Sequence, residues 1–579
     1  MKTSTTLALA LALALSLAAC GDRTLAPSAD DGGATPDTEL APDATAPAPD
    51  SGPASPDALS APDLPAFTDA GAPTPDVAQM PMVPPPKTGD LSTAKAITEL
   101  SPEQVLWAHE GIGGGKYPEV VAWIKSARAG RLVALVETQE PLTIAGTTLG
   151  SAGLTAQNLR EVHAVEIDKS GVTRWVTFLR ARSPRCHHVV AVDDELLVSC
   201  DSSDTFTVLP LSPAARTFTV AKNQNAGGLV RFGFDGTLRF ARLVEGVQVN
   251  GVRADPGRDI ALFGTFYDHV SLAASAAPLL TRIKPPSKGF YTGSGFMLRF
   301  DRNTGAILAA SQIDGDASSA IGDVLLRADG SALVCGAAGG YSSNGQAIAT
   351  FNPGRASELS FLSFSGGDPS AVAFLARFDR KADGRDEATW VRGGYGYLDT
   401  QGLCRLAAIS SSHVAINVGG GSTLAWSGGP TLLGTSGSPI VIYQDNGVPV
   451  GGASVAVTLS DNKYVYGAGA NLIGPGSAHI TMVSGRELYF DAYSAAPRVL
   501  SFPAPPATDR HGYLNVVADI DWQARLLAVR WGLQPVVLST QSAPTFVRFA
   551  RTSTDEGALA GSFYGVMRFG GAQVTVGSA

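Results

Sequence analysis

Four cysteines are the side chains best suited to covalent chemistry: Cys186, Cys200, Cys335 and Cys404. Cys186 and Cys200 flank a hairpin pattern whose turn centres near residue 193. They would therefore face each other in an antiparallel pair, and we predict a disulfide there. Cys335 ends one strand-like run and Cys404 begins another in the next repeat, where a bridge and two buried thiols both stay open. Disulfides fit an oxidising compartment.

Two patterns resemble metal ligands only loosely. His187 and His188 are adjacent, so on a strand they point to opposite faces and cannot easily hold one ion. Acidic residues also gather in two loops without the spacing of an EF-hand. They are Asp314, Asp316 and Asp323, and Asp379, Asp383, Asp386 and Glu387. Loose Ca²⁺ sites can have this appearance. We interpret these loops as solvated turns and predict no metal and no cofactor, with Ca²⁺ as the alternative.

The segment Gly434–Pro439 is similar to the nucleophile loop of chymotrypsin-like serine proteases, with Ser436 as nucleophile. No Ala-Ala-His segment lies upstream, and the nearest histidine, His413, falls on a predicted strand. The segment also parallels residues 146–153, a spacer between repeats. We therefore interpret it as a spacer and predict no catalytic residues.

Three arginines recur at one place, just before a Phe: Arg231, Arg299 and Arg377. We favour a structural role, in which they pair with backbone carbonyls or with aspartates such as Asp301 and Asp379. An anion-binding ring is the alternative. Residues 91–579 carry no net charge and contain no basic run, which excludes typical nucleic-acid binding.

These residues lie in a repeated unit, clearest at 295–336. Four short apolar runs, at 296–301, 306–312, 324–326 and 332–335, alternate with turns, two of which contain Gly305 and Gly330. The first run recurs at 162, 229, 374, 440 and 514. Most copies add a turn glycine, and several carry an aromatic residue on the second run. The glycines are Gly171, Gly236, Gly305, Gly384 and Gly447, and the aromatics are Trp107, Trp175, Phe240, Trp390 and Trp531.

The pattern predicts an all-β fold. One such sheet cannot bury its own faces, whereas copies packed in a ring can. We predict a β-propeller of about seven four-stranded blades, with six or eight open. The tail at 566–571 and 574–576 would complete the first blade. An array of β-sandwiches is the structural alternative.

The repeat Phe-x-Ala-Arg-Phe-Asp, its turn Gly, its Trp strand and Phe-Gly-Gly resemble the SBBP-type β-propeller repeat of bacterial surface proteins. The resemblance covers most of residues 104–579, in degenerate copies. It implies a propeller on an exported protein. That family is defined by its repeats and not by a reaction, so no catalytic residue carries over.

The N-terminal part predicts a lipid anchor. Residues 1–19 read as a signal peptide, and Leu17–Cys20 matches the bacterial lipobox, which implies cleavage before Cys20 and its acylation. Acyl chains on Cys20 would hold the protein to a bilayer in the cell envelope, and we favour the outer over the inner membrane. Residues 20–90 form a tether. Between 21 and 90 there are 15 prolines, 12 acidic and 2 basic residues, so this segment cannot form a core. The propeller follows at 91–579.

We therefore expect a non-catalytic surface lipoprotein whose propeller binds an envelope or extracellular protein or glycan. The candidate binding loops are 275–293 and 341–368. The candidate contacts are their aromatics, with inward packing as the alternative for each: Phe290, Tyr291, Tyr341, Phe351 and Phe361. The alternative is an extracellular propeller enzyme, a glycan lyase or hydrolase or a peptidase.

Overall fold

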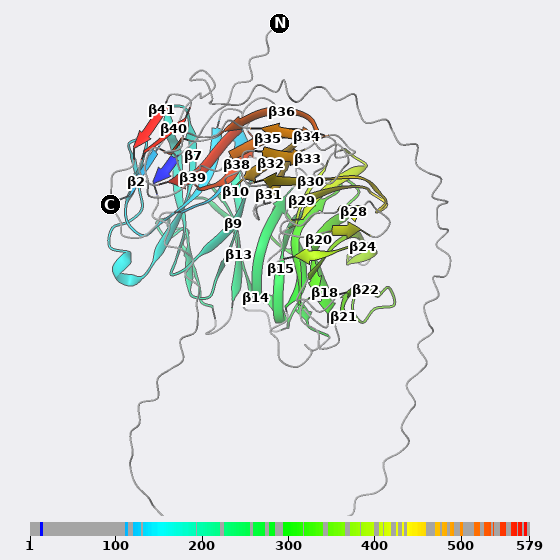
Figure 1. Cartoon of the computed structure of the whole chain (residues 1–579). Coiled ribbons are helices and arrows are strands. Elements are labelled where there is room, and N and C mark those ends of the chain that lie inside the picture. The colour runs from blue at the N-terminus through cyan, green and yellow to red at the C-terminus, as the bar shows by residue number, and fades with distance from the viewer. Residues whose placement is uncertain are drawn as a thin grey trace, which may run out of the picture. The chain divides into compact units, whose positions relative to one another are not determined.

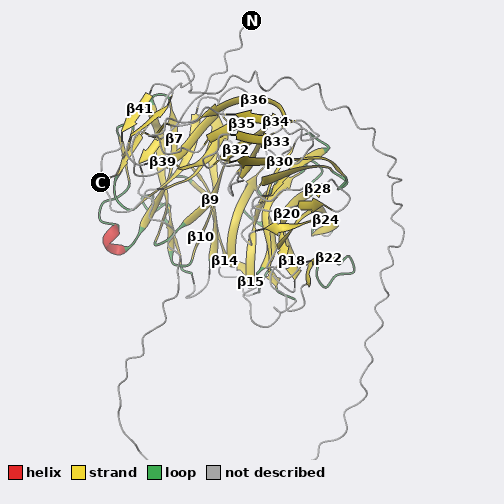
Figure 2. Cartoon of the chain, in the orientation of Figure 1, coloured by secondary structure: helices red, strands yellow, loops and turns green. Residues whose placement is uncertain are grey.

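The computed structural model describes strands at 12–14, 110–113 and 120–128, and then residues 131–449 with short gaps at 193, 221–224, 255–258, 273–276, 284–292, 316–317, 340–345, 365–370, 383, 399–403, 409, 419–423, 427–430 and 433–436. After residue 449 it describes the backbone of strands up to 575. Nearly all of this is strand, and the helix among these residues is the 3₁₀ turn Thr155–Gln157 (Figure 2). The all-β prediction is confirmed. Residues 18–90, which hold most of the predicted tether, form a unit of their own and lie outside the described residues.

One six-stranded antiparallel sheet shows how the chain passes between sheets. Its strands, in spatial order, are β3 (Val120–Arg128), β4 (Arg131–Thr138), β7 (Arg160–Asp168), β8 (Gly171–Ala181), β11 (Phe206–Val208) and β12 (Arg216–Phe218). They form three hairpins, β3–β4, β7–β8 and β11–β12. Between β8 and β11 the chain leaves to make β9 and β10 of another sheet. Each sheet is therefore completed only after the next one has begun.

Two further sheets follow the same path. The first contains β19 (Ser318–Leu326), β20 (Ala332–Gly339), β23 (Ala371–Arg380), β24 (Asp386–Leu398), β27 (Leu424–Trp426) and β28 (Thr431–Leu432). The second contains β25 (Cys404–Ala408), β26 (His413–Val418), β29 (Gly437–Gln444), β30 (Pro449–Thr458), β33 (Glu487–Phe490) and β34 (Arg498–Ser501). We call the two or three hairpins that follow such a path a strand set.

The ten-stranded sheet joins two strand sets. It contains β9 (Arg185–Val192), β10 (Glu195–Ser202), β13 (Ala226–Gly233), β14 (Leu238–Ala254), β15 (Ile260–Leu272), β16 (Leu280–Thr281), β17 (Ser294–Phe300), β18 (Ile307–Gly315), β21 (Gln346–Phe351) and β22 (Leu359–Phe364). The first half of β14 pairs with β13, and its second half pairs with the start of β15. Gly246 lies at the change, with φ +81°, and a Cβ there would stand 2.0 Å from the His269 carbonyl oxygen. Only glycine allows this exchange of partners.

The remaining strands form three sheets. One contains β31 (Gly469–Gly474), β32 (Ser477–Met482), β35 (Leu514–Ile520) and β36 (Leu526–Leu533), and another contains β37 (Val536–Val537), β40 (Val566–Phe569) and β41 (Ala572–Thr575). The third contains β38 (Thr545–Arg551), β39 (Gly557–Phe563), β1 (Ala12–Ala14), β2 (Glu110–Gly113), β5 (Leu142–Ile144) and β6 (Thr147–Leu149). This sheet places strands of the N-terminal part, β1 and β2, beside β39 of the C-terminal part (Figure 1).

The end strands correct the expectation that the C-terminal tail completes the first blade. The predicted tail, now β40 and β41, pairs with β37, whereas β38 and β39 join the N-terminal strands instead. Residues 12–14 of the predicted signal peptide form β1, which pairs in parallel with β39 and β2. A short Leu/Ala strand of this kind satisfies backbone groups of both neighbours.

The repeat unit is also divided differently from the prediction. The four runs of residues 295–336 become β17–β18 and β19–β20, and these two hairpins belong to different sheets. The expected up-and-down sheet of four strands is therefore wrong, and the regular sheets contain six. Turn glycines mark tight hairpins within each pair, but the sequence carries no signal that tells a hairpin connection from a crossing to the next sheet.

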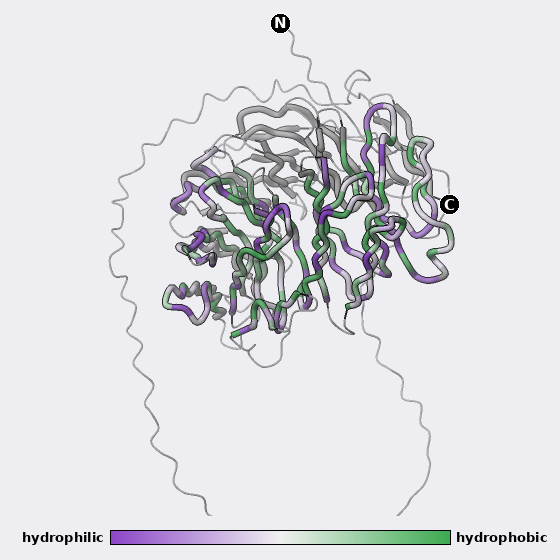
Figure 3. Tube along the Cα trace, turned by 180° about the vertical axis from the view of Figure 1, so that it is seen from behind, coloured by the Kyte–Doolittle hydropathy of each residue, from purple (hydrophilic) through white to green (hydrophobic). Residues whose placement is uncertain are grey.

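Neighbouring strand sets bury their apolar faces against each other. Phe178 of β8 stacks on Phe232 of β13 with ring centroids 5.0 Å apart, and both side chains are fully buried. Apolar residues run along the strands, and hydrophilic ones gather at the turns (Figure 3). This core follows from the alternation of side chains along each strand, which turns one face of a sheet toward the next.

A repeated contact fixes the spacing between strand sets. Phe240 of β14 packs under the turn that joins β17 to β18, so that a Cβ on Gly305 would stand 2.7 Å from its ring. Arg242, two residues along the same strand, donates to the carbonyl oxygens of Thr304 and Gly305, each at 2.8 Å. Trp390 and Arg392 of β24 repeat the arrangement at Gly447. We call this group of an aromatic ring, an arginine and a turn glycine the turn lock.

We expect Gly305→Ala to destabilise the protein more than Gly330→Ala. Both glycines have positive φ, at +64° and +83°, so each alanine costs about 1–2 kcal/mol in backbone strain. Only at Gly305 does the new Cβ also meet Phe240, whereas Gly330 has nothing within 4 Å. Urea unfolding of the two variants measures the difference. Equal losses would show that the turn lock contributes nothing.

Candidate functional site

One cavity among the described residues is a pocket with a volume of about 400 Å³, a size typical of small-ligand sites. It is lined by Leu279, Leu280, Thr281, Ile283, Ser311, Gln312, Asn352, Pro353, Gly354, Arg355 and Asp386. These residues come from the segment around β16, from β18, from the β21–β22 turn and from the start of β24. Both loops that the sequence marked, 275–293 and 341–368, therefore contribute to it.

The pocket lies at a junction where the turn lock is missing. In the strand register Phe240 faces Arg231, Trp390 faces Arg377, and Ala309 takes the same place opposite Arg299. Two residues along β18, Ser311 stands where the other strands carry Arg242 and Arg392. Two small side chains thus replace a ring and a guanidinium, and Ser311 lines the resulting space.

Asn352 shapes the pocket wall. Its φ of +53° starts the β21–β22 turn, a conformation that asparagine tolerates better than most residues. Its side chain donates to the carbonyl oxygens of Ser357 and Ala388, at 2.8 and 2.9 Å, and accepts from the Ala388 N–H at 2.8 Å. The turn of one strand set is thereby bound to β24 of the next.

The floor of the pocket is formed by Asp386, which belongs to an ion-pair network. Asp386, 1% exposed, accepts from Arg380 at 2.7 Å and from Arg299 at 3.3 Å through Oδ1, and both arginines also reach Asp259, at 3.3 and 2.8 Å. Asp386 Oδ2 is buried without a hydrogen-bond partner. Two cations and two anions balance, so the floor offers polar atoms without a net charge.

The rim of the pocket is mixed in character. Ile283 is 53% exposed, and Pro353 lies on the opposite loop. Arg355 pairs with Glu387 at 3.4 Å, so its charge is also compensated. Apolar surface beside balanced polar groups suits an uncharged ligand that has both hydroxyl groups and an apolar face.

The predicted contact aromatics divide into two groups. Phe351 is fully buried and packs against Phe374 and Phe378, with centroids 5.2 and 6.4 Å apart, so the prediction that it contacts a partner is wrong. Residues Phe290, Tyr291 and Tyr341 and the side chain of Phe361 lie outside the described residues.

The recurrent arginines support neighbouring turns. Arg231 donates to the Arg302 carbonyl oxygen at 2.5 Å, and Arg299 donates to the Gly330 carbonyl oxygen at 2.6 Å. Arg377 pairs with Asp379 and Asp329, each at 2.7 Å. The structural role that we favoured is thus confirmed for these three arginines, whereas Asp301 instead caps its own turn by accepting from the Thr304 N–H at 2.7 Å.

The described acidic side chains of the two loops form hydrogen bonds and ion pairs within the protein. Asp314 is fully buried and accepts from the Ser294 hydroxyl at 2.6 Å and from the Ile283 N–H at 2.8 Å, so it anchors the pocket rim. Asp316 and Asp383 lie outside the described residues. Among the residues that can be described, no group of three or more acidic, His or Cys side chains has the arrangement of a metal site.

The histidines of the sequence motifs lie apart from the pocket. His188 of β9 is buried with its ring edge-on to Phe263, and the side chain of His187 lies outside the described residues. His413 contacts the hydroxyls of Ser410 and Ser412, at 3.1 and 3.0 Å. Ser436, the nucleophile of the protease alternative, is also not described.

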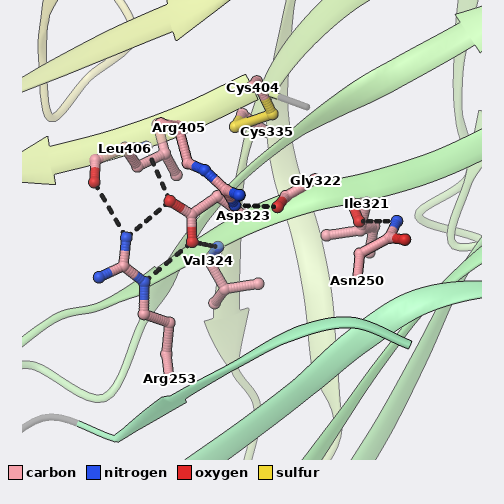
Figure 4. Close-up of a disulfide and its surroundings, with 10 residues drawn as sticks. All are labelled: Asn250, Arg253, Ile321, Gly322, Asp323, Val324, Cys335, Cys404, Arg405 and Leu406. Atoms are coloured by element: carbon pink, nitrogen blue, oxygen red, sulfur yellow. Dashed lines mark hydrogen bonds and ion pairs between the residues drawn. A yellow bond between two sulfur atoms is a disulfide. The ribbon is translucent and has the colours of Figure 1, made fainter. Parts of the chain in front are cut away.

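Both disulfides are formed. In the β9–β10 hairpin a bulge after Ser199 brings Cys200 opposite Cys186, a pairing that the register of the rest of the hairpin would miss by one residue. Cys335 of β20 and Cys404 of β25 join two different sheets (Figure 4). The bridge, and not a pair of free thiols, is the outcome at this second site.

Removing the Cys335–Cys404 bridge should cost more stability than removing Cys186–Cys200. The bridges span 69 and 14 residues, and restriction of the unfolded chain gives about 4 and about 3 kcal/mol. Urea unfolding of the two double-alanine variants tests this order. A greater loss for Cys186→Ala/Cys200→Ala would contradict it.

The sequence analysis did not predict a role for one buried histidine, His163. His163 of β7 is fully buried between the hydroxyls of Thr138 and Thr177, at 2.9 and 3.0 Å. Burial lowers the pKa of His163 to about 4, against the opposing charge of Glu161. Its place on an alternating strand is the one signal that could have indicated burial.

The stability of the protein should therefore fall as the pH drops from about 6.5 to about 4. In this range His163 is protonated in the unfolded chain but stays neutral in the native state. The free energy of unfolding therefore falls by about 3 kcal/mol. Urea unfolding at pH 7 and pH 4 should show a smaller loss for His163→Gln than for the wild type. The control His413→Gln, at the half-buried start of β26, should keep the wild-type loss. Equal losses in both variants would contradict the assignment.

Comparisons with known proteins give no family. No family model matches the chain, and no curated protein matches it. Two solved structures align weakly, both of the extracellular domain of BT4673 from B. thetaiotaomicron, titled a one-component system in one case and a hybrid two-component system in the other. They share 8% identity in both cases, cover 72% and 71% of this chain and 78% and 77% of their own, and have TM-scores of 0.16 and 0.15. Likeness at this level carries no argument about function.

Proposed function

We propose that this chain is a lipid-anchored protein of the bacterial cell envelope whose β-propeller binds a glycan without catalysis. The lipobox at Cys20 and the acidic, proline-rich tether support the anchor, and we favour the outer membrane. The two disulfides support an oxidising compartment. No helix within the described residues combines the length and apolarity needed to cross a bilayer.

Chain topology supports the propeller. The interleaved hairpins define seven strand sets, which begin with β38, β3, β9, the second half of β14, β19, β25 and β31. Each of these first strands contacts the first strand of the next set, and β31 contacts β38 in turn. We propose that they surround a central axis as seven blades of up to six strands, similar to the SBBP-type repeat.

The pocket at the missing turn lock carries the binding proposal. At the junctions that have a turn lock, a ring and an arginine fill the space beside the neighbouring turn. Here the small side chains of Ala309 and Ser311 stand in their place, and a pocket of about 400 Å³ stays open. A space of this size holds a small part of a polymer. The charge-balanced floor and the apolar Ile283 and Pro353 favour an uncharged sugar segment over a charged peptide.

Ile283→Glu should weaken glycan binding at least tenfold. The change places a charge on the exposed rim without touching the core, and tenfold corresponds to about 1.4 kcal/mol. The full chain would be immobilised, and polysaccharides and proteins of the native envelope would be passed over it with and without Ca²⁺. Leu211→Glu is the matched control, because Leu211 is 62% exposed and does not line the pocket.

The retention experiment distinguishes glycan binding from protein binding and from catalysis. A polysaccharide retained by the wild type and Leu211→Glu, but released by Ile283→Glu, supports the proposal. Retention of a protein alone, or equal retention by all three chains, overturns it. An envelope polymer that is shortened instead of retained would favour the enzyme alternative.

A further inference from the structure

A second polar cluster, none of whose residues lines the pocket, lies where β14, β19 and β25 meet (Figure 4). Asp323 of β19 is fully buried. Its Oδ1 accepts from Arg253 Nε and from the Val324 N–H, each at 2.9 Å. Its Oδ2 accepts from Arg253 Nη2 at 2.6 Å and from the Leu406 N–H at 2.9 Å. A carboxylate accepts about four hydrogen bonds, so Asp323 is saturated.

Arg405 of β25 stands beside this pair, and no carboxylate of the described residues forms an ion pair with it. Its hydrogen bond, from Nη1 to the Gly322 carbonyl oxygen, is long at 3.4 Å. A guanidinium has five N–H donors. The side chain is half-buried, and its nitrogen atoms are not among the buried polar atoms that lack a partner. Its remaining donors are therefore accessible to solvent.

The charges of the described residues around Arg405 are unbalanced. Arg253, Arg405 and Asp323 together carry one net positive charge. Burial lowers the pKa of Arg405; the charge of Asp323 opposes this, and that of Arg253 adds to it. A partly desolvated cation without a close anion is costly, and an anion placed against it relieves that cost.

The backbone around Arg405 is held in place. Cys404, the preceding residue, is bonded to Cys335 of β20, and the next residue, Leu406, donates its N–H to Asp323. Gly322 lets β25 approach closely, because a Cβ there would stand 2.8 Å from Cys404 Sγ. A preorganised guanidinium of this kind suits bidentate recognition of an oxyanion.

We propose that Arg405, backed by Arg253, binds an oxyanion, the carboxylate or phosphate group of a ligand, at the junction of β14, β19 and β25. The site is separate from the pocket and does not depend on glycan binding there. Planar guanidinium groups match both carboxylate and phosphate, and lysine does not reproduce the fork.

Thermal unfolding of the full chain tests this site. Sodium phosphate or sodium acetate would be titrated at constant ionic strength, set with sodium chloride. The unfolding midpoint of the wild type should rise with one or both anions, because a ligand that binds only the folded state stabilises it. The rise should vanish in Arg405→Met, and the apparent affinity should fall at least tenfold in Arg405→Lys. Arg182→Met, an exposed arginine 3.3 Å from Asp204, should keep the wild-type response.

The two anions distinguish the source of the oxyanion. A response to phosphate alone indicates a phosphorylated ligand, and a response to acetate indicates a carboxylate. A rise of equal size in the wild type and Arg405→Met overturns the proposal, because general salt effects would explain it. If Arg405→Met does not fold, equilibrium dialysis of phosphate and acetate with the wild type and Arg405→Lys decides. No saturable uptake by the wild type, or equal affinity in both, also overturns it.

Discussion

The contact between a turn of one strand set and the side chains of the set before it is the constraint on which the structure depends. A hairpin turn exposes carbonyl oxygens that a neighbouring sheet would otherwise bury unpaired. Arg242 and Arg392 supply donors to these oxygens, while Phe240 and Trp390 fill the space that Gly305 and Gly447 leave free. The glycine is required twice, for its positive φ and for the absence of a Cβ. Ring, arginine and glycine thus work as one unit.

The interleaved chain path extends this dependence. Each set receives its last hairpin only after the next set has begun, so neighbours are joined by chain as well as by packing. The Cys335–Cys404 bridge adds a covalent link between two sheets. Asp323 adds a polar link, since its carboxylate binds groups from β14 and β25. Rigid sheets held in this way can position polar groups without help from flexible loops.

Both candidate sites arise where this regular packing is interrupted. At the pocket, Ala309 and Ser311 replace the ring and the arginine, and the Asp259–Arg299–Arg380–Asp386 network takes over the contact between sets. At the junction of β14, β19 and β25, Arg253 and two backbone N–H groups saturate the carboxylate of Asp323. Arg405 is left with a single long hydrogen bond.

The all-β class, the turn glycines, the recurrent arginines and the Cys186–Cys200 pair could all be predicted from the sequence, because each follows from local geometry. Alternation, positive φ and hairpin spacing act over a few residues. The lipobox at Cys20 and the tether stay predictions of the sequence alone. The division of residues 295–336 between two sheets, the bulge after Ser199 and the roles of Phe351 and His163 depended on contacts between distant segments. The pocket illustrates the reason. The absence of an aromatic on β18 is visible in the sequence, but only the packed neighbours decide whether the space collapses or stays open.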